Sequence, residues 1–173
     1  VEIPGDSPMH AGTGAGVIFG ATGGVMEAAL RTAYFTLKGE NPPADAFKAV
    51  RSGGFQENAG VQEAEFAIGD IKLRTAAVSG FGNTRRLLQQ IERGEVELDL
   101  VEVMSCRTGC VGGAGQPYAL MSTKLKRAHG LYEIDRSAMF KRSERNPVLD
   151  AMYAAGLNER AHELLHHEYK NRS

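Results

Sequence analysis

The chain is poor in cysteine, has no tryptophan and carries no excess charge of either sign. Its 20 lysine and arginine residues nearly balance 21 aspartate and glutamate residues, for a net charge of −1. This balance excludes a nucleic-acid reader driven by bulk electrostatics, because neutralising phosphates needs a clear excess of cations. No hydrophobic run approaches the roughly 20 residues that cross a bilayer, so we expect no membrane span. The length of 173 residues fits one domain, alone or with an appendage.

The N-terminal sequence lacks the pattern of a secretory signal peptide. The chain begins with Val1 and not with methionine, so we expect it to be trimmed or cut from a longer polypeptide. Two cysteines are too few for the disulfide framework of a small secreted domain. We therefore expect the cytoplasm rather than the periplasm.

Periodic patterns predict an α/β fold with a mixed sheet flanked by helices. The region 1–16 reads as loop because it is rich in proline and glycine. The elements expected after it are helices over 25–38 and 44–50, strands over 64–68, 71–78 and 98–104, and helices over 84–93 and from 118 to about 128.

The C-terminal part differs in character from the rest. Two short amphipathic helices are expected there, the first with Asn146 as cap and Pro147 at its first position, the second capped by Asn158. Two such helices cannot form their own core. We therefore divide the chain into a main part, 1–128, and a wrapping helical appendage, 129–173.

The appendage contains an H-E-x-x-H sequence, from His162 to His166. On a helix these two histidines share a face, with Glu163 available as a base for a zinc-bound water. A catalytic zinc ion also needs a third protein ligand, and Glu168 is too close along the same helix to complete a tetrahedron. We favour a polar surface face over a zinc site.

Two glycine-rich turns also precede helices. Residues 78–85 have the context of a dinucleotide fingerprint, and Glu102 follows about 20 residues later. Arg85 occupies the third glycine position, where a side chain hinders helix–strand packing, so we favour a plain turn. The region 12–24 offers backbone N–H groups that suit an anion or cofactor, but it has no Gly-Lys-Ser/Thr of a P-loop.

The strongest signal is the segment 102–117, in which Cys106 and Cys110 lie among glycines. Thiolates suit iron or zinc, and glycines let backbone N–H groups approach the sulfurs of a cluster. Two thiolates are half of the four ligands that an iron–sulfur cubane usually needs. Either another chain or segment supplies the others, or the pair is a redox dithiol. Two buried thiols that pack as small hydrophobic groups are the structural alternative.

Residues 102–117 resemble the third cluster-binding motif of the iron-only (di-iron) hydrogenases, Glu-x-Met-x-Cys-x-x-x-Cys-x-x-Gly-Gly-Gly-Gln-Pro. Residues 13–33 resemble the loop and helix that wall the same pocket, and 146–166 resemble the family's small-subunit segment. The departures from the motif are Ser105, Arg107-Thr108 and Ala114, which replace the commoner Ala, Pro-Gly and Gly.

The resemblance implies that the cofactor is the H-cluster, a 4Fe–4S cubane linked to a di-iron unit with CO, cyanide and dithiolate ligands. By matching position, Cys106 and Cys110 would ligate metal, with Cys110 bridging the two units. Met104 would place its thioether against the di-iron unit, which makes Met104 and Cys110 the implied catalytic residues. The other implied cofactor-binding residues are Phe19, Gly20 and Val25. The implied reaction is the reversible cleavage of H2 into protons and electrons.

The family's first two motifs, which carry its other cluster cysteines and a proton-relay cysteine, are absent from the sequence. We therefore expect one lobe of the catalytic domain plus the small-subunit-like appendage. The implied partners are the N-terminal half of that domain and an electron carrier such as ferredoxin. The chain alone should be inactive. Two alternatives are a non-catalytic assembly or sensing module and a dithiol redox protein.

Overall fold

The computed structural model describes residues 11–51, 60–113 and 115–166. Its strands are β1 (Val61–Ile68), β2 (Ile71–Ser79) and β3 (Leu100–Met104). Its α-helices are α1 (Gly14–Ile18), α2 (Gly24–Lys38), α3 (Phe81–Glu92), α4 (Met121–Ser137), α5 (Pro147–Met152) and α6 (Asn158–Leu165). Short 3₁₀ turns lie at Lys48–Val50, Cys110–Gly112 and Ser143–Arg145. Within these ranges every helix is too short or too polar to traverse a bilayer.

The three strands form one mixed sheet in the order β1-β2-β3. β1 pairs antiparallel with β2 through the turn at 69–70, and β3 pairs parallel with β2, so that Thr75 faces Leu100 and Ser79 faces Met104. The parallel pair needs a crossover, which α3 supplies. The predicted mixed sheet with flanking helices is confirmed.

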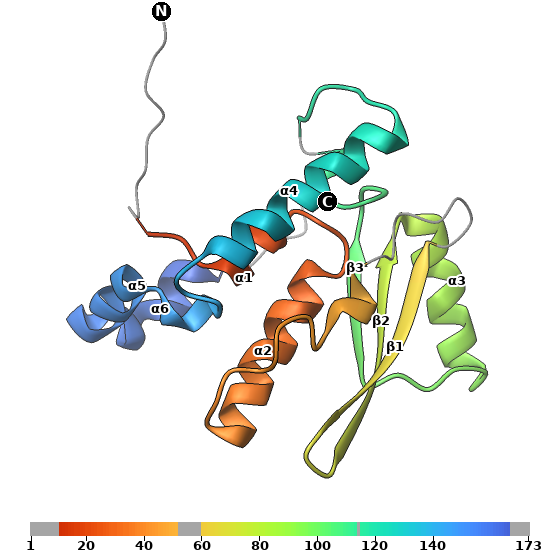
Figure 1. Cartoon of the computed structure of the whole chain (residues 1–173). Coiled ribbons are helices and arrows are strands. Elements are labelled where there is room, and N and C mark those ends of the chain that lie inside the picture. Colours follow the sequence, from red (N-terminus) through yellow and green to blue (C-terminus); the bar gives the residue numbers. More distant parts are fainter. Residues whose placement is uncertain (1–10, 52–59, 114, 167–173) are drawn as a thin grey trace, which may run out of the picture.

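Helices cover both faces of the sheet (Figure 1). On one face α2 packs its buried Met26 and Leu30 against Ile68 of β1. On the other face Leu87 of α3 packs against Ala76 and Val78 of β2. Residues 75–79 are buried on both sides, which explains why this stretch lacks the polar alternation of an exposed strand.

A short helix forms where a glycine-rich loop was predicted, so the prediction of loop over 1–16 is wrong for α1. Thr13 caps this helix by accepting the backbone N–H of Gly16 on its hydroxyl. Gly14 is required because a Cβ atom there would overlap the carboxylate of Asp135 on α4. Gly14, one of the glycines that argued against an element, thus allows α1 and α4 to approach closely.

Three further predictions differ from the structure. The helix expected to end near residue 128 continues to Ser137, and the expected division at 128/129 therefore falls inside α4. The helix expected over 44–50 is only a 3₁₀ turn. Asn158 lies inside the helical geometry and caps nothing, because the chain before it makes a kinked π-helical turn at Gly156, where φ is +106°.

The first cap of the appendage is confirmed, since the Asn146 side chain accepts the N–H groups of Val148 and Leu149. The described parts of α5 and α6 contain no buried residue. The sequence pattern predicts Leu164, Leu165 and Tyr169 on one side of the last helix. Leu164 and Leu165 are 52% and 64% exposed, and Tyr169 lies outside the described residues.

Candidate metal centre

The two cysteines follow directly from the parallel part of the sheet. β2 and β3 end together at the pair Ser79 and Met104, and the N–H of Gly80 donates to the carbonyl of Met104 at 2.8 Å. The carboxyl ends of parallel strands are the usual place for a ligand in sheets of this kind. The segment with Cys106 and Cys110 therefore begins at the edge where a site is expected.

Both thiols are free and exposed. The Cys106 sulfur lies against the backbone of Gly113, where a Cβ atom would overlap it. The chain between the thiols turns through Thr108 and Gly109, with φ of +75° and +80°. This exposure argues against two buried thiols packing as small hydrophobic groups.

Backbone hydrogen bonds hold the cysteine loop against the turn between α1 and α2. The N–H of Val111 donates to the carbonyl of Gly20 at 3.0 Å, and the N–H of Thr22 donates to the carbonyl of Thr108 at 3.4 Å. A Cβ atom at Gly109 would approach the backbone of residues 20–22 within 3.1 Å, so only glycine fits there. The cysteine loop (106–111) and the turn at 20–22 thus form one continuous surface, which we call the wall of the candidate site.

A buried carboxylate connects the same two segments. Glu102 of β3 accepts the N–H of Gly23 at 2.6 Å and that of Met26 at 2.7 Å, at the first turn of α2. Burial raises the pKa of the Glu102 carboxyl above its ordinary value, and the backbone N–H groups of residues 23, 25 and 26 partly oppose this shift. The positive end of the helix dipole favours the anion there.

The structure brings the predicted site residues to this wall. Met104 is half-buried at the end of β3 and lies two residues beyond Glu102, so it shares the α2 face of the sheet. Gly20 is half-buried and bonded to the loop, Val25 is half-buried next to Met26, and Phe19 is 43% exposed. Their roles toward a cofactor stay predictions.

The loop also carries strain that the sequence did not reveal. Thr108 is fully buried, and a β-branched residue is seldom found at its φ of +75°. Its hydroxyl and that of Thr22 have no hydrogen-bond partner in the described structure. Backbone strain of this kind occurs at functional sites more often than elsewhere. The family motif has glycine at this position, which would remove the strain.

The H-E-x-x-H sequence lies on the surface, and the dinucleotide-like segment at 78–85 forms a plain turn into α3. His162 and His166 stack with ring centroids 4.4 Å apart, while Glu163 pairs with Arg160 at 3.1 Å, and all four residues are exposed. No group of three potential metal-ligating side chains occurs among the described residues. The turn at 79–83 is closed by Asn83, whose amide donates to the Ser79 carbonyl.

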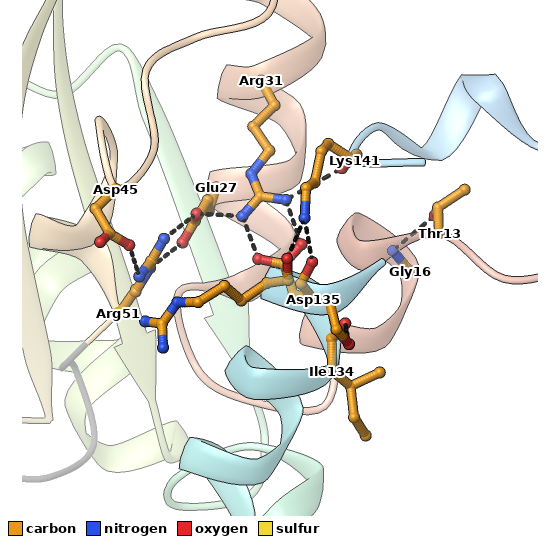
Figure 2. A network of polar contacts seen from close by, with 11 residues as sticks. Thr13, Gly16, Glu27, Arg31, Asp45, Arg51, Ile134, Asp135 and Lys141 are labelled. Carbon is orange, nitrogen blue, oxygen red and sulfur yellow. Dashed lines mark hydrogen bonds and ion pairs between the residues drawn. The ribbon is translucent and has the colours of Figure 1, made fainter. Parts of the chain in front are cut away.

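Sequence analysis missed a buried ion-pair network that joins α2, α4 and the 3₁₀ turn after residue 47. Arg31 pairs with Glu27 and Asp135, and Arg51 pairs with Glu27 and Asp45 (Figure 2). A cavity of about 350 Å³ borders this network. The spacing of Glu27 and Arg31 on one helix face was the only signal available in the sequence.

The model of the family described as iron only hydrogenase large subunit, C-terminal domain, matches residues 2–114. This match covers more than half of the chain. The chain belongs to this hydrogenase family. A second family model, iron hydrogenase small subunit, matches residues 121–172 and agrees with the predicted small-subunit resemblance of the tail.

The chain is also similar in sequence to curated hydrogenases. The chain is 42% identical to NADP-reducing hydrogenase subunit HndD of Solidesulfovibrio fructosivorans and 37% identical to iron hydrogenase 1 of Clostridium pasteurianum. These matches cover 96% and 95% of the chain, but only 28% and 30% of the relatives. The chain therefore spans less than a third of the length of these proteins.

Solved structures confirm the predicted fold. A structure titled for stepwise [FeFe]-hydrogenase H-cluster assembly matches with a TM-score of 0.67 and 34% identity over 97% of the chain and 50% of the neighbour. HydA1 from Chlamydomonas reinhardtii matches with a TM-score of 0.63 and 37% identity over the same shares. The chain thus corresponds to one lobe of these hydrogenases and about half of their length.

Not every relative is named as a hydrogenase. Cytosolic iron-sulfur assembly component 3 of Mus musculus is 32% identical over 87% of the chain and 31% of that protein. The relatives therefore include both named hydrogenases and a named iron–sulfur assembly component.

Proposed function

We propose that the chain supplies two of the four cluster cysteines of an iron-only hydrogenase and needs the other half of the catalytic domain for activity. The observation that carries this proposal is the exposed pair Cys106 and Cys110, held at the carboxyl end of β3 beside the α1–α2 turn. The assembled enzyme would catalyse H2 ⇌ 2H⁺ + 2e⁻, with an electron carrier such as ferredoxin taking or giving the electrons.

The residues present fit half of an iron–sulfur site. Soft thiolate ligands are available on one loop, and Gly113 leaves room for backbone close to the Cys106 sulfur. No third ligating side chain joins them among the described residues, and we propose that the remaining ligands come from the other half of the catalytic domain. When bound, the H-cluster would supply the open iron site and the base for cleaving hydrogen.

The protein's own contributions would be ligation, placement and exclusion of water. Cys106 and Cys110 would hold the cluster through iron as thiolates. Met104 would present its thioether from the end of β3. Phe19 and Val25 would provide apolar surface on the neighbouring wall, with Gly20 holding the loop through its carbonyl.

Iron binding by the chain can be tested with iron and sulfide under anaerobic conditions. We expect iron retention that depends on both thiols, so that Cys106→Ser and Cys110→Ser each lose it, and no hydrogen turnover by this chain alone. A control is Ser122→Ala at an exposed position on α4, which leaves both thiols and the Ser105 hydroxyl beside Cys106 in place. Thiols that form a titratable Cys106–Cys110 disulfide without any iron dependence would support the dithiol redox alternative.

A chimera can separate a hydrogenase from a non-catalytic assembly or sensing module. The mouse relative, which is named as an iron-sulfur assembly component, motivates this comparison. The chain would replace the matching region of iron hydrogenase 1 of Clostridium pasteurianum, to which it is 37% identical. We expect hydrogen turnover by the loaded chimera and none with Cys110→Ser. A folded chimera that holds iron but turns over no hydrogen would favour the assembly or sensing module.

A further inference from the structure

A glycine-rich loop connects Cys110 to α4 (Figure 1). Its described part contains three glycines, Gly112, Gly113 and Gly115. The backbone of glycine has more conformational freedom than that of any other residue, so a loop of this composition loses much entropy when it takes one conformation. Contacts from outside the loop are therefore needed to keep it in place.

The position of this loop affects Cys106 as well as Cys110. The backbone of Gly113 lies so close to Cys106 that a Cβ atom at residue 113 would be 2.4 Å from its sulfur. The N–H of Gly113 donates to the carbonyl of Cys110 at 3.1 Å, and the N–H of Gln116 donates to the carbonyl of Gly113 at 2.9 Å. The loop backbone and the two cysteines thus form one structural unit.

The side chain of Arg127 on α4 bridges the two ends of this loop. Its Nη1 donates to the carbonyl of Val111 at 3.1 Å, and its Nη2 donates to the carbonyl of Pro117 at 3.0 Å. Both bonds have a charged donor, which makes them stronger than bonds between neutral groups. One guanidinium group therefore holds together two carbonyls on either side of the glycines.

Val111 is anchored through both of its backbone groups. Its N–H donates to the carbonyl of Gly20 in the α1–α2 turn at 3.0 Å, while its carbonyl accepts the bond from Arg127. Its side chain is 6% exposed and packs in one cluster with Ala21 and Ala128. Because Ala128 follows Arg127 on α4, the polar and the apolar contacts act at the same place. Val111 is thereby fixed between the α1–α2 turn and α4.

We propose that Arg127 is a positioning residue for the two thiols, because it holds residues 111 and 117 together and so keeps the loop backbone against Cys106. Its effect on a cluster rests on the proposed function, whereas its effect on the loop concerns the iron-free chain alone. Arg127 acts through backbone carbonyls and not as an iron ligand, since a guanidinium group is always protonated and only donates. A lysine replaces it only in part, because one ammonium group lacks the planar fork that reaches two carbonyls.

Hydrogen exchange of the reduced, iron-free chain tests the contact with Arg127→Ala. Mass spectrometry follows a peptide that spans residues 109–118, where exchange reports on local opening of the backbone. We expect exchange to become about tenfold faster, the change that loss of one charge-assisted hydrogen bond would produce. Arg127→Lys should give an intermediate rate. Unchanged exchange in Arg127→Ala would overturn the proposal.

The matched control is Lys126→Ala, which removes one positive charge from the neighbouring, exposed position of the same helix. We expect its loop exchange to change by less than about twofold, as for an ordinary surface substitution. Equal effects of Lys126→Ala and Arg127→Ala would contradict a specific role of Arg127. If Arg127→Ala does not fold, Arg127→Lys is compared with Lys126→Ala instead, and faster loop exchange in the lysine variant alone is the expected result.

The reactivity of the two thiols gives a readout that a general loss of stability would not produce. Labelling with iodoacetamide is followed for each cysteine separately by mass spectrometry, beside urea unfolding of the same proteins. We expect Arg127→Ala to raise the ratio of the Cys106 rate to the Cys110 rate severalfold, because the backbone of Gly113 would no longer lie against the Cys106 sulfur. An unchanged ratio would count against positioning of the thiols.

Iron retention distinguishes this inference from the proposed function. After anaerobic reconstitution with iron and sulfide, we expect Arg127→Ala to retain severalfold less iron than the unmodified chain, with Arg127→Lys between them. If the unmodified chain retained no iron while Arg127→Ala showed faster loop exchange, the proposed function would fail and the loop contact would stand. Full iron retention by Arg127→Ala despite faster loop exchange would overturn the role of Arg127 toward the cluster.

Discussion

The carboxylate of Glu102 on β3 accepts the backbone N–H of Met26 on α2 at 2.7 Å, across 76 residues of sequence. The same carboxylate accepts the N–H of Gly23, so it binds the first turn of the helix at two points. Val25 lies between these two residues, and Met104 follows Glu102 on the strand. The Glu102 side chain therefore fixes the first turn of α2, which borders the candidate site, relative to the strand that leads to the cysteines.

Glu102→Gln should destabilise the chain, because a side-chain amide offers one acceptor and turns an N–H donor toward a backbone N–H. A buried donor left unsatisfied costs about 1–3 kcal/mol. Burial raises the pKa of the Glu102 carboxyl above its ordinary value of 4.5, because it disfavours the charged form. The folded state therefore binds this proton more tightly than the unfolded chain does. The resulting contribution to the free energy of unfolding is complete below pH 4.5 and is lost as the pH rises through the folded-state pKa. We therefore expect the cost of the substitution to shrink between pH 4 and pH 7. Urea unfolding of both proteins at several pH values measures it.

Asp99→Asn is a suitable comparison for that experiment, since Asp99 accepts the N–H of Arg74 at an exposed position and its pKa is lowered by that backbone bond. The pH dependence of stability has the opposite sign at Asp99. The contribution of its carboxylate to the free energy of unfolding is present above the ordinary pKa and is lost as the pH falls. A cost of Glu102→Gln that grew with pH would contradict the assignment of burial as the dominant effect.

Local signals in the sequence predicted local structure well. The Asn146 cap with Pro147 behind it is confirmed, as are the helix over 25–38 and the strands over 64–68 and 71–78. These features depend on residues within a few positions of each other. The sequence motif around Cys106 and Cys110 likewise led to the family, because its residues are contiguous.

Long-range partners were not predictable from one sequence. Asp135 pairs with a residue 104 positions away, and nothing in its own neighbourhood indicates this. The same separation explains the missed helix α1, whose Gly14 lies against Asp135 of α4. Glu102 was predicted as part of a motif, but its bond to α2 depends on the packing of helix against sheet.

Gly113→Ala should displace the Cys106 sulfur, because the new Cβ atom would overlap it. The sulfur can rotate away, but the Cβ atom of Cys106 would also lie 2.9 Å from the new methyl group, so we expect a stability loss of about 1–3 kcal/mol, in the range of overpacking. Iron retention after anaerobic reconstitution should fall severalfold. Iron analysis together with thermal unfolding of the same sample separates the two effects.

Gly82→Ala serves as the control for that substitution. It adds the same methyl group in a position where no atom lies within 4 Å of the Cβ atom. Iron retention should be unchanged in this variant. If both alanines reduced iron retention equally, the contact between Gly113 and Cys106 would have no special role.

A pair of glycine substitutions in two helices should change stability in opposite directions. Gly24 begins α2 where a Cβ atom would overlap the carbonyl oxygen of Ile18, and this backbone atom cannot move without shifting α1. We expect Gly24→Ala to lower the free energy of unfolding by about 1–3 kcal/mol, in the range of overpacked cores. Gly130 lies inside α4 with open space around it, so Gly130→Ala should raise stability by about 0.5–1 kcal/mol through helix propensity. Urea unfolding of the two variants beside the unmodified chain tests both signs at once, and a stabilising Gly24→Ala would show that α1 and α2 are not in the close contact described.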